Sequence, residues 1–166
     1  VGDALIMGVE SLTELNLDRL IWKNNASIDL SLFFNFSTIS SEYVRSDEPG
    51  IEGKKVEFIP THNYKLGTRF GFKNFYTSLQ LTSVGEQFSD ASNAVEGTLS
   101  GVIGKIPSYQ IIDFSTNYLF GKFKIETGIN NLANEVYFTR RATGYPGPGI
   151  IPSPPRNFYL TIQFKQ

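Results

Sequence analysis

The residues best suited to chemistry in this chain are the adjacent arginines Arg140 and Arg141, followed by Tyr145 in a glycine- and proline-rich stretch. A guanidinium is planar and permanently charged, and its paired N–H donors match a carboxylate or a phosphate. We therefore predict that Arg140 and Arg141 contact an anionic ligand and that Tyr145 stacks on it. In the alternative interpretation, the arginines bind lipopolysaccharide phosphate or simply solvate the loop, and Tyr145 packs on its own prolines.

Other kinds of site find little support in the sequence. His62 is the only histidine and there is no cysteine, so neither a multi-histidine nor a thiolate metal site can be built. We find no serine in a nucleophile elbow and no carboxylates paired for acid–base work, so we predict no enzyme activity and no cofactor. Residues 144–149 superficially suggest a phosphate cradle, but their prolines remove the backbone donors that a cradle needs. A net charge of −1 gives no reason to expect a nucleic-acid partner.

The elements that position these residues are strands, because apolar and polar residues alternate with a period of two. Ile112, Phe114 and Tyr118 alternate with Asp113 and Asn117, for example. No segment has convincing helical periodicity, and no apolar run approaches the roughly 20 residues of a spanning helix. We predict seven strands, over residues 4–17, 26–43, 62–72, 75–82, 112–120, 123–130 and 157–165.

The connections between these strands alternate between short and long. Turns of about two residues lie at 73–74 and 121–122, and a somewhat longer stretch surrounds Trp22. Each of the other three connections has about 18 residues or more, far beyond the usual hairpin loop. This rhythm is typical of outer-membrane β-barrels, which place short turns in the periplasm and long loops outside the cell.

The alternation also assigns the two faces of the predicted sheet. We expect the apolar face to meet lipid and the polar face to line a charged lumen, with Phe33 as the exception in its strand. Aromatic residues near the strand ends predict girdles at the two bilayer interfaces. The predicted lumen charges are those of Lys65, Arg69, Asp113, Lys124 and Glu126.

The strand count and two competing functions complete this interpretation. Bacterial barrels use an even number of strands, so seven strands predict part of a wall, with at least one further strand before Val1.

A soluble β-sandwich binding module could use the same alternation with its apolar faces turned inward. An outer-membrane lipase would need a serine beside His62, and no convincing partner is found.

The final sixty residues carry blocks of more specific sequence. Ile106-Pro107-Ser108-Tyr109 leads to Asp113-Phe114-Ser115, and residues 130–138 read NNLANEVYF. Arg140-Arg141 and the GYPGPG of residues 144–149 follow. Together with Gly8-Val9-Glu10 upstream, these blocks resemble the carboxyl-terminal end of TonB-dependent outer-membrane receptors, closest to the ferric-dicitrate type.

That resemblance implies an architecture and a function. Residues 1–166 would be the C-terminal portion of a 22-stranded barrel, whose N-terminal plug domain is absent here. Such receptors sit in the outer membrane of Gram-negative bacteria and import a ferric chelate, either ferric citrate or a siderophore. TonB with ExbB and ExbD supplies the energy through the missing N-terminal part. Members for cobalamin or glycans leave a non-iron substrate open. One departure is that Phe164 is followed by Lys165-Gln166, where a terminal aromatic residue is common.

Overall fold

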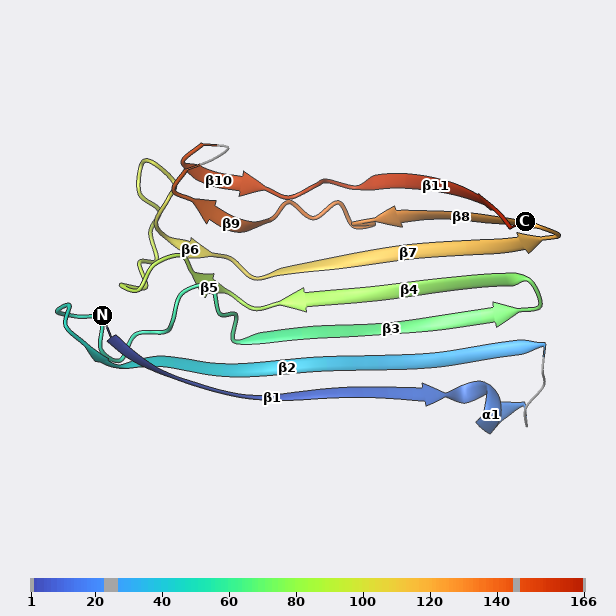
Figure 1. The fold of residues 1–166 in the computed structure, drawn as a ribbon, viewed down its shortest axis with the longest axis horizontal. Helices are drawn as coiled ribbons and strands as arrows, with labels where there is room; N and C mark the ends of the chain where they lie inside the picture. Colours follow the sequence, from blue (N-terminus) through green and yellow to red (C-terminus); the bar gives the residue numbers. More distant parts are fainter. Residues whose placement is uncertain (1, 23–26, 145–146, 166) are drawn as a thin grey trace.

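The computed structural model describes residues 2–22, 27–144 and 147–165, which are organised around one antiparallel sheet of seven strands (Figure 1). Each strand pairs with the next one along this sheet, and the seven predicted strands are confirmed. In spatial order the strands are β1 (Gly2–Asn16), β2 (Ile28–Ser46), β3 (His62–Phe72), β4 (Phe75–Val84), β7 (Tyr109–Phe120), β8 (Phe123–Asn130) and β11 (Asn157–Phe164).

The structure differs from the sequence prediction after β1 and inside the long connections. A short helix that we had not predicted, α1 (Leu17–Ile21), begins where we had expected the first strand to end. Pairing with β2 ends at Asn16, and the chain then turns back with Trp22 N–H donating to the Asp18 carbonyl at 2.9 Å. Four short strands were also not predicted, namely β5 (Gln87–Phe88), β6 (Lys105–Ile106), β9 (Phe138–Ala142) and β10 (Gly149–Pro152).

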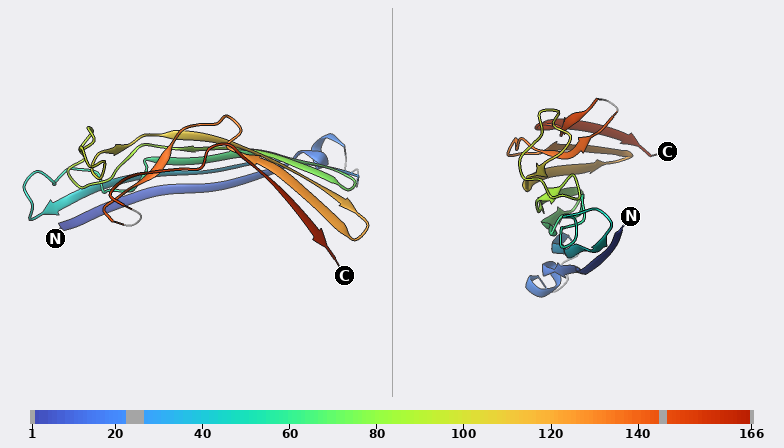
Figure 2. Two further views of the ribbon diagram at one scale, coloured as in Figure 1. Left: turned by 90° about the horizontal axis from the view of Figure 1, so that it is seen from above. Right: turned by 90° about the vertical axis from the view of Figure 1, so that its left-hand side faces the viewer.

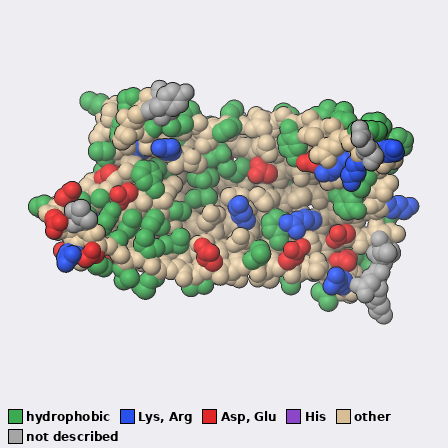
Figure 3. All heavy atoms as spheres, viewed as in Figure 1, with side chains coloured by type: hydrophobic (Ala, Val, Ile, Leu, Met, Phe, Trp, Pro, Cys, Tyr) green, Lys and Arg blue, Asp and Glu red, His purple; other side chains and the backbone are tan. Residues whose placement is uncertain are grey.

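The sheet is curved, and its two faces differ in chemistry (Figure 2). Figure 3 looks onto the concave face, where acidic and basic side chains gather over the middle of the sheet. The opposite, convex face carries large apolar side chains that remain exposed, among them Phe34, Leu66, Leu79, Ile125 and Ile162. The described residues provide no second sheet against this face, although a soluble sandwich would require one.

Charged groups on the concave face are partly paired. Arg69 forms an ion pair with Glu14 at 3.3 Å, two strands away, and Lys124 pairs with Glu126 at 2.7 Å. Lys65 has no ion-pair partner among the described residues and borders a small polar hollow of about 200 Å³. The concave face is therefore a polar surface with some unpaired charge.

Phe33 breaks the alternation because it covers a glycine. It faces Gly67 across the β2–β3 ladder and is buried there, with the Arg69 guanidinium 4.6 Å above its ring. Two more glycines are covered by the ring directly opposite: Tyr76 covers Gly71, and Tyr159 covers Gly128. In each pair the absence of a β-carbon leaves the room that the ring occupies.

The two ends of the sheet have different connections. The turn end carries the short turns and α1, and the loop end carries the long connections (Figure 1). Lys73 and Gly121 open the short turns with φ of 54° and 57°. The Asn74 carbonyl accepts a hydrogen bond from Leu119 N–H at 2.9 Å, which holds one turn against the next hairpin. Within the described residues, no helix is long and apolar enough to cross a membrane.

Candidate ligand-binding site at the loop end

Three segments make up the candidate site: the first loop (residues 47–61), the middle loop (89–104) and the last loop (the β9–β10 hairpin). The middle loop is closed at its base by the short β5–β6 ladder, in which Ile106 is completely buried. Ser89 Oγ lies 2.9 Å from the Gly104 carbonyl and accepts a hydrogen bond from Gly104 N–H at 3.0 Å. This loop therefore has a defined shape.

The side chain of Asn93 joins the first loop to the middle loop. Its amide accepts a hydrogen bond from Lys55 N–H at 2.7 Å and donates one to the Lys55 carbonyl at 2.8 Å. Asn93 adopts a left-handed φ of 55°, which asparagine tolerates better than most residues. Phe58 N–H adds a bond to the Phe88 carbonyl at 2.8 Å. Backbone bonds of this kind fix the relative position of the two loops.

Arg141 joins the last loop to the middle loop. Its guanidinium donates to the carbonyls of Gly101 at 2.8 Å and Lys105 at 2.9 Å, and it lies over the Phe138 ring. Most of its hydrogen-bonding capacity is therefore used within the protein. In the structure Arg141 holds the last loop against the middle loop. The ligand contact predicted for Arg141 stays a prediction.

Arg140 is placed differently from its neighbour. Its side chain is exposed and has no ion pair or hydrogen bond with another described residue. It borders an open hollow of about 750 Å³ between the three loops. The hollow is lined by Phe58, Gln87, Ser89, Asp90, Val102, Ile103, Thr139, Arg140, Arg141 and Thr143. Tyr145, the third predicted ligand contact, lies outside the described residues.

The lining also contains one carboxylate, that of Asp90. Its Oδ1 accepts hydrogen bonds from the backbone and hydroxyl of Ser92, whereas Oδ2 is buried with no partner among the described residues. The hollow therefore presents a free cation, whereas the spare acceptor oxygen of Asp90 is buried in its wall. Such a surface suits an anionic ligand.

Metal-binding residues do not gather here. Within the described residues, no group of three or more His, Cys, Asp or Glu side chains is arranged to hold a metal ion. His62 begins β3 and stacks on Tyr64, with ring centroids 4.8 Å apart.

Residues 1–132 match the family profile described as "TonB dependent receptor-like, beta-barrel". The match covers well over half of the chain. This chain belongs to the TonB-dependent receptor family. Members of this family are outer-membrane β-barrels that act as receptors and transporters.

Solved structures agree with this membership at the level of the fold. The ferric citrate transporter FecA in its unliganded form matches 96% of this TonB-dependent receptor chain, with 23% identity and a TM-score of 0.86. The siderophore receptor PiuA from Acinetobacter baumannii matches 99% at 18% identity and 0.70, and the copper transporter OprC matches 98% at 18% and 0.71. The chain spans about a quarter of the length of these proteins (24%, 22% and 24%).

The NNL block of this TonB-dependent receptor has a structural role that sequence reasoning missed. Asn131 is 2% exposed with φ of 54°, and its side chain exchanges hydrogen bonds with the backbone of Glu135 at 2.8 and 2.9 Å. Its own N–H donates to Asp113 Oδ1 at 2.9 Å. The block thus anchors the chain as it leaves β8. The known preference of asparagine for left-handed turns was the available signal.

Proposed function

We propose that this receptor imports a ferric chelate, either ferric citrate or a siderophore, across the outer membrane of a Gram-negative bacterium. Residues 1–166 form the C-terminal portion of the barrel wall. TonB with ExbB and ExbD supplies energy through the part of the receptor that precedes this chain. The observation that carries the proposal is the free Arg140 guanidinium, which borders a hollow between loops at one end of the barrel wall. Family membership and the iron-chelate receptors among the structural neighbours support it.

A non-iron cargo is the second candidate, and the similarity to the copper transporter OprC favours it. The two candidates separate in an uptake assay on cells that carry the full-length receptor as their sole importer of this kind. Accumulation of radiolabelled iron from citrate or a siderophore supports the first. Copper accumulation without iron accumulation contradicts it.

Arg140→Ala is expected to weaken binding of an anionic ferric chelate about fivefold, since a partly exposed charge contact contributes up to about 1 kcal/mol. The loss should shrink at higher salt, where the attraction is screened. Arg140→Lys retains the charge and should recover part of the affinity. Ligand titration of purified full-length receptors at two salt concentrations measures these effects. Equal affinity of the wild type and Arg140→Ala would mean that Arg140 is a solvated loop residue without ligand contact.

Cysteine labelling tests the direction in which the strands cross the membrane. A cysteine replacing Leu99, which is fully exposed at the loop end, is expected to react with a membrane-impermeant maleimide on whole cells. A cysteine replacing Asn74 or Lys122 in the short turns is expected to react only after the outer membrane is opened. The opposite labelling pattern would reverse the proposed orientation.

A further inference from the structure

Basic side chains gather at the turn end without ion-pair partners. Arg19, Lys73, Lys122 and Lys165 are exposed there, and none forms an ion pair with another described residue. Figure 3 shows lysine and arginine side chains at this right-hand end of the molecule. The acids nearest this end in the described residues are Asp18, Asp29 and Glu126, and Glu126 is paired with Lys124. The turn end therefore carries an excess of positive charge.

Two of these lysines lie along aromatic rings of the convex face. Lys73 Nζ is 5.2 Å from the centroid of the Phe72 ring, and Lys122 Nζ is 5.9 Å from that of Phe164. Both rings are exposed and continue the apolar rows of β3 and β11. A lysine whose stem follows an apolar surface presents its ammonium group at the edge of that surface. The ammonium groups thus mark the border between the apolar face and water.

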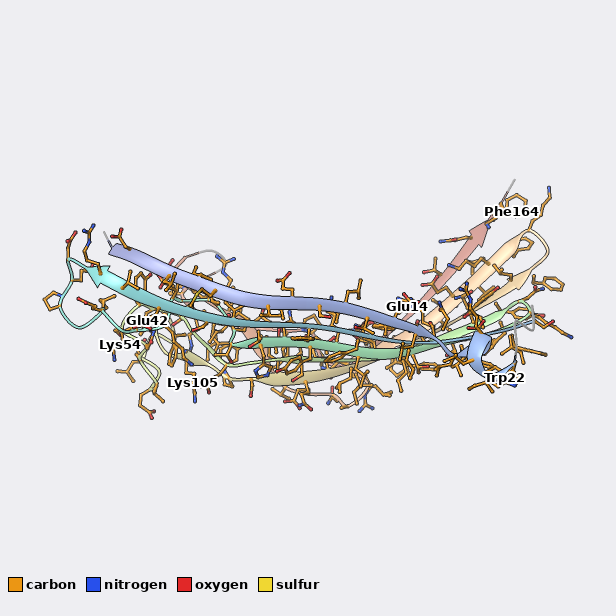
Figure 4. The ribbon with its side chains drawn as sticks, turned by 90° about the horizontal axis from the view of Figure 1, so that it is seen from below. Glu14, Trp22, Glu42, Lys54, Lys105 and Phe164 are labelled. Atoms are coloured by element: carbon orange, nitrogen blue, oxygen red, sulfur yellow. The ribbon has the colours of Figure 1, made fainter. Side chains whose placement is uncertain are left out.

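The helix α1 adds apolar groups at the same border. Leu20, Ile21 and Trp22 are 75%, 58% and 40% exposed. Figure 4 shows Trp22 projecting on the convex side of the sheet, next to α1. Tryptophan favours the interface between hydrocarbon and water. Arg19 lies immediately before these residues in the helix.

We propose that the turn end is a binding surface for anionic phospholipid headgroups. Lys73 and Lys122 contact the phosphates, while Trp22 and the neighbouring apolar residues of α1 insert among the upper parts of the acyl chains. The lysine ammonium groups lie directly beside an exposed apolar face, and this favours a lipid over a soluble anion. A lipid can contact both the cations and the apolar face, whereas free phosphate would contact only the cations. This inference requires the convex face to meet lipid, and it does not depend on which cargo is transported.

Lipid binding to the full-length receptor tests the proposal. Delipidated receptor in detergent is titrated with phosphatidylglycerol or phosphatidylcholine, and retained lipid is counted by native mass spectrometry. Lys73→Gln with Lys122→Gln is expected to weaken phosphatidylglycerol binding about fivefold per lysine, the typical contribution of one lysine near an anionic surface. Phosphatidylcholine binding should change little. Lys73→Arg with Lys122→Arg should restore most of the affinity.

The loop end provides a matched control. Lys55 Nζ lies 6.0 Å from the Phe88 ring, a similar lysine–aromatic contact at the opposite end of the sheet. Lys54→Gln with Lys55→Gln should therefore leave phosphatidylglycerol binding at the wild-type level. Heat-modifiable gel mobility shows whether each variant is folded. If the double variant folds poorly, Lys122→Gln alone, at an exposed turn, is used to test the proposal instead. Unchanged phosphatidylglycerol binding in the turn-end variants, an equal loss in the loop-end control, or displacement of the lipid by free glycerol phosphate would overturn the proposal.

Discussion

Leu79→Arg is expected to lower the free energy of unfolding by about 2–4 kcal/mol for the full-length receptor in lipid vesicles. Leu79 lies near the middle of β4 on the convex face and is 43% exposed. Its neighbours around an apolar hollow include Leu32, Leu66 and Leu81. An arginine there would place a permanent charge in hydrocarbon, far from either interface. Denaturant unfolding followed by gel mobility or fluorescence measures the loss.

Gln80→Arg is the matched control, because Gln80 is adjacent in sequence and points to the concave face. It lies opposite Asp113 in the β4–β7 ladder, so the new guanidinium has a carboxylate nearby. Gly67 lies opposite Gln80 in the β3–β4 ladder and has no β-carbon, although the Phe33 ring covers it. We expect a loss well below that of Leu79→Arg. Equal losses for the two variants would mean that the convex face does not meet lipid.

Gly67→Ala is expected to lower the free energy of unfolding by about 1–3 kcal/mol through overpacking. A β-carbon at this position would collide with the Phe33 ring and lie 2.8 Å from the Leu79 carbonyl oxygen. The strand can relieve the first contact only by moving the ring and Arg69 above it. Unfolding of the full-length receptor measures the effect. Phe33→Ala should recover part of the loss in combination with Gly67→Ala, because the ring contact is then absent.

Gly144→Ala serves as the control for the glycine substitution. A β-carbon at Gly144 would meet no atom within 4 Å, and its φ is not in the left-handed region. This substitution should be close to neutral. If Gly67→Ala is equally neutral, the ring-over-glycine pairs do not constrain the sheet.

The sequence predicted the sheet well because alternation determines both the strands and their faces. One row of apolar residues on each strand was sufficient to assign the convex face, and the short turns at 73–74 and 121–122 fixed two hairpins. The failures occurred where tertiary contacts decide the structure. α1 forms in a connection, and the β5–β6 and β9–β10 pairs are too short to show periodicity. Phe33 needed knowledge of its cross-strand partner, Gly67.

The candidate site was predictable only in part for the same reason. Arg140 and Arg141 are identical in type and adjacent, so the sequence offered no reason to separate them. In the structure Arg141 bonds to the carbonyls of Lys105 in β6 and Gly101 in the middle loop, which lie 36 and 40 residues away in sequence, while Arg140 remains free. Asn93 and Phe58 were missed because their bonds join loops with no recognisable motif. Whether Arg140, Arg141 or Tyr145 contacts a ligand stays a prediction.

The length of β2 sets the height of the first loop above the membrane. Nineteen residues at roughly 3.3 Å each span about 60 Å, whereas a tilted strand crosses the hydrocarbon core in about 9–11 residues. The surplus length remains paired with β1, and at its far end Arg45 bonds to Asp3 at 3.0 Å (Figure 1). The paired surplus is a stiff ribbon, so the loop's distance from the bilayer is fixed by the ladder and not by chain flexibility. Deleting two consecutive residues from β2, together with the two residues of β1 that pair with them, would bring the loop about 7 Å closer to the bilayer. Because side chains alternate with a period of two, the same face of the sheet would remain apolar.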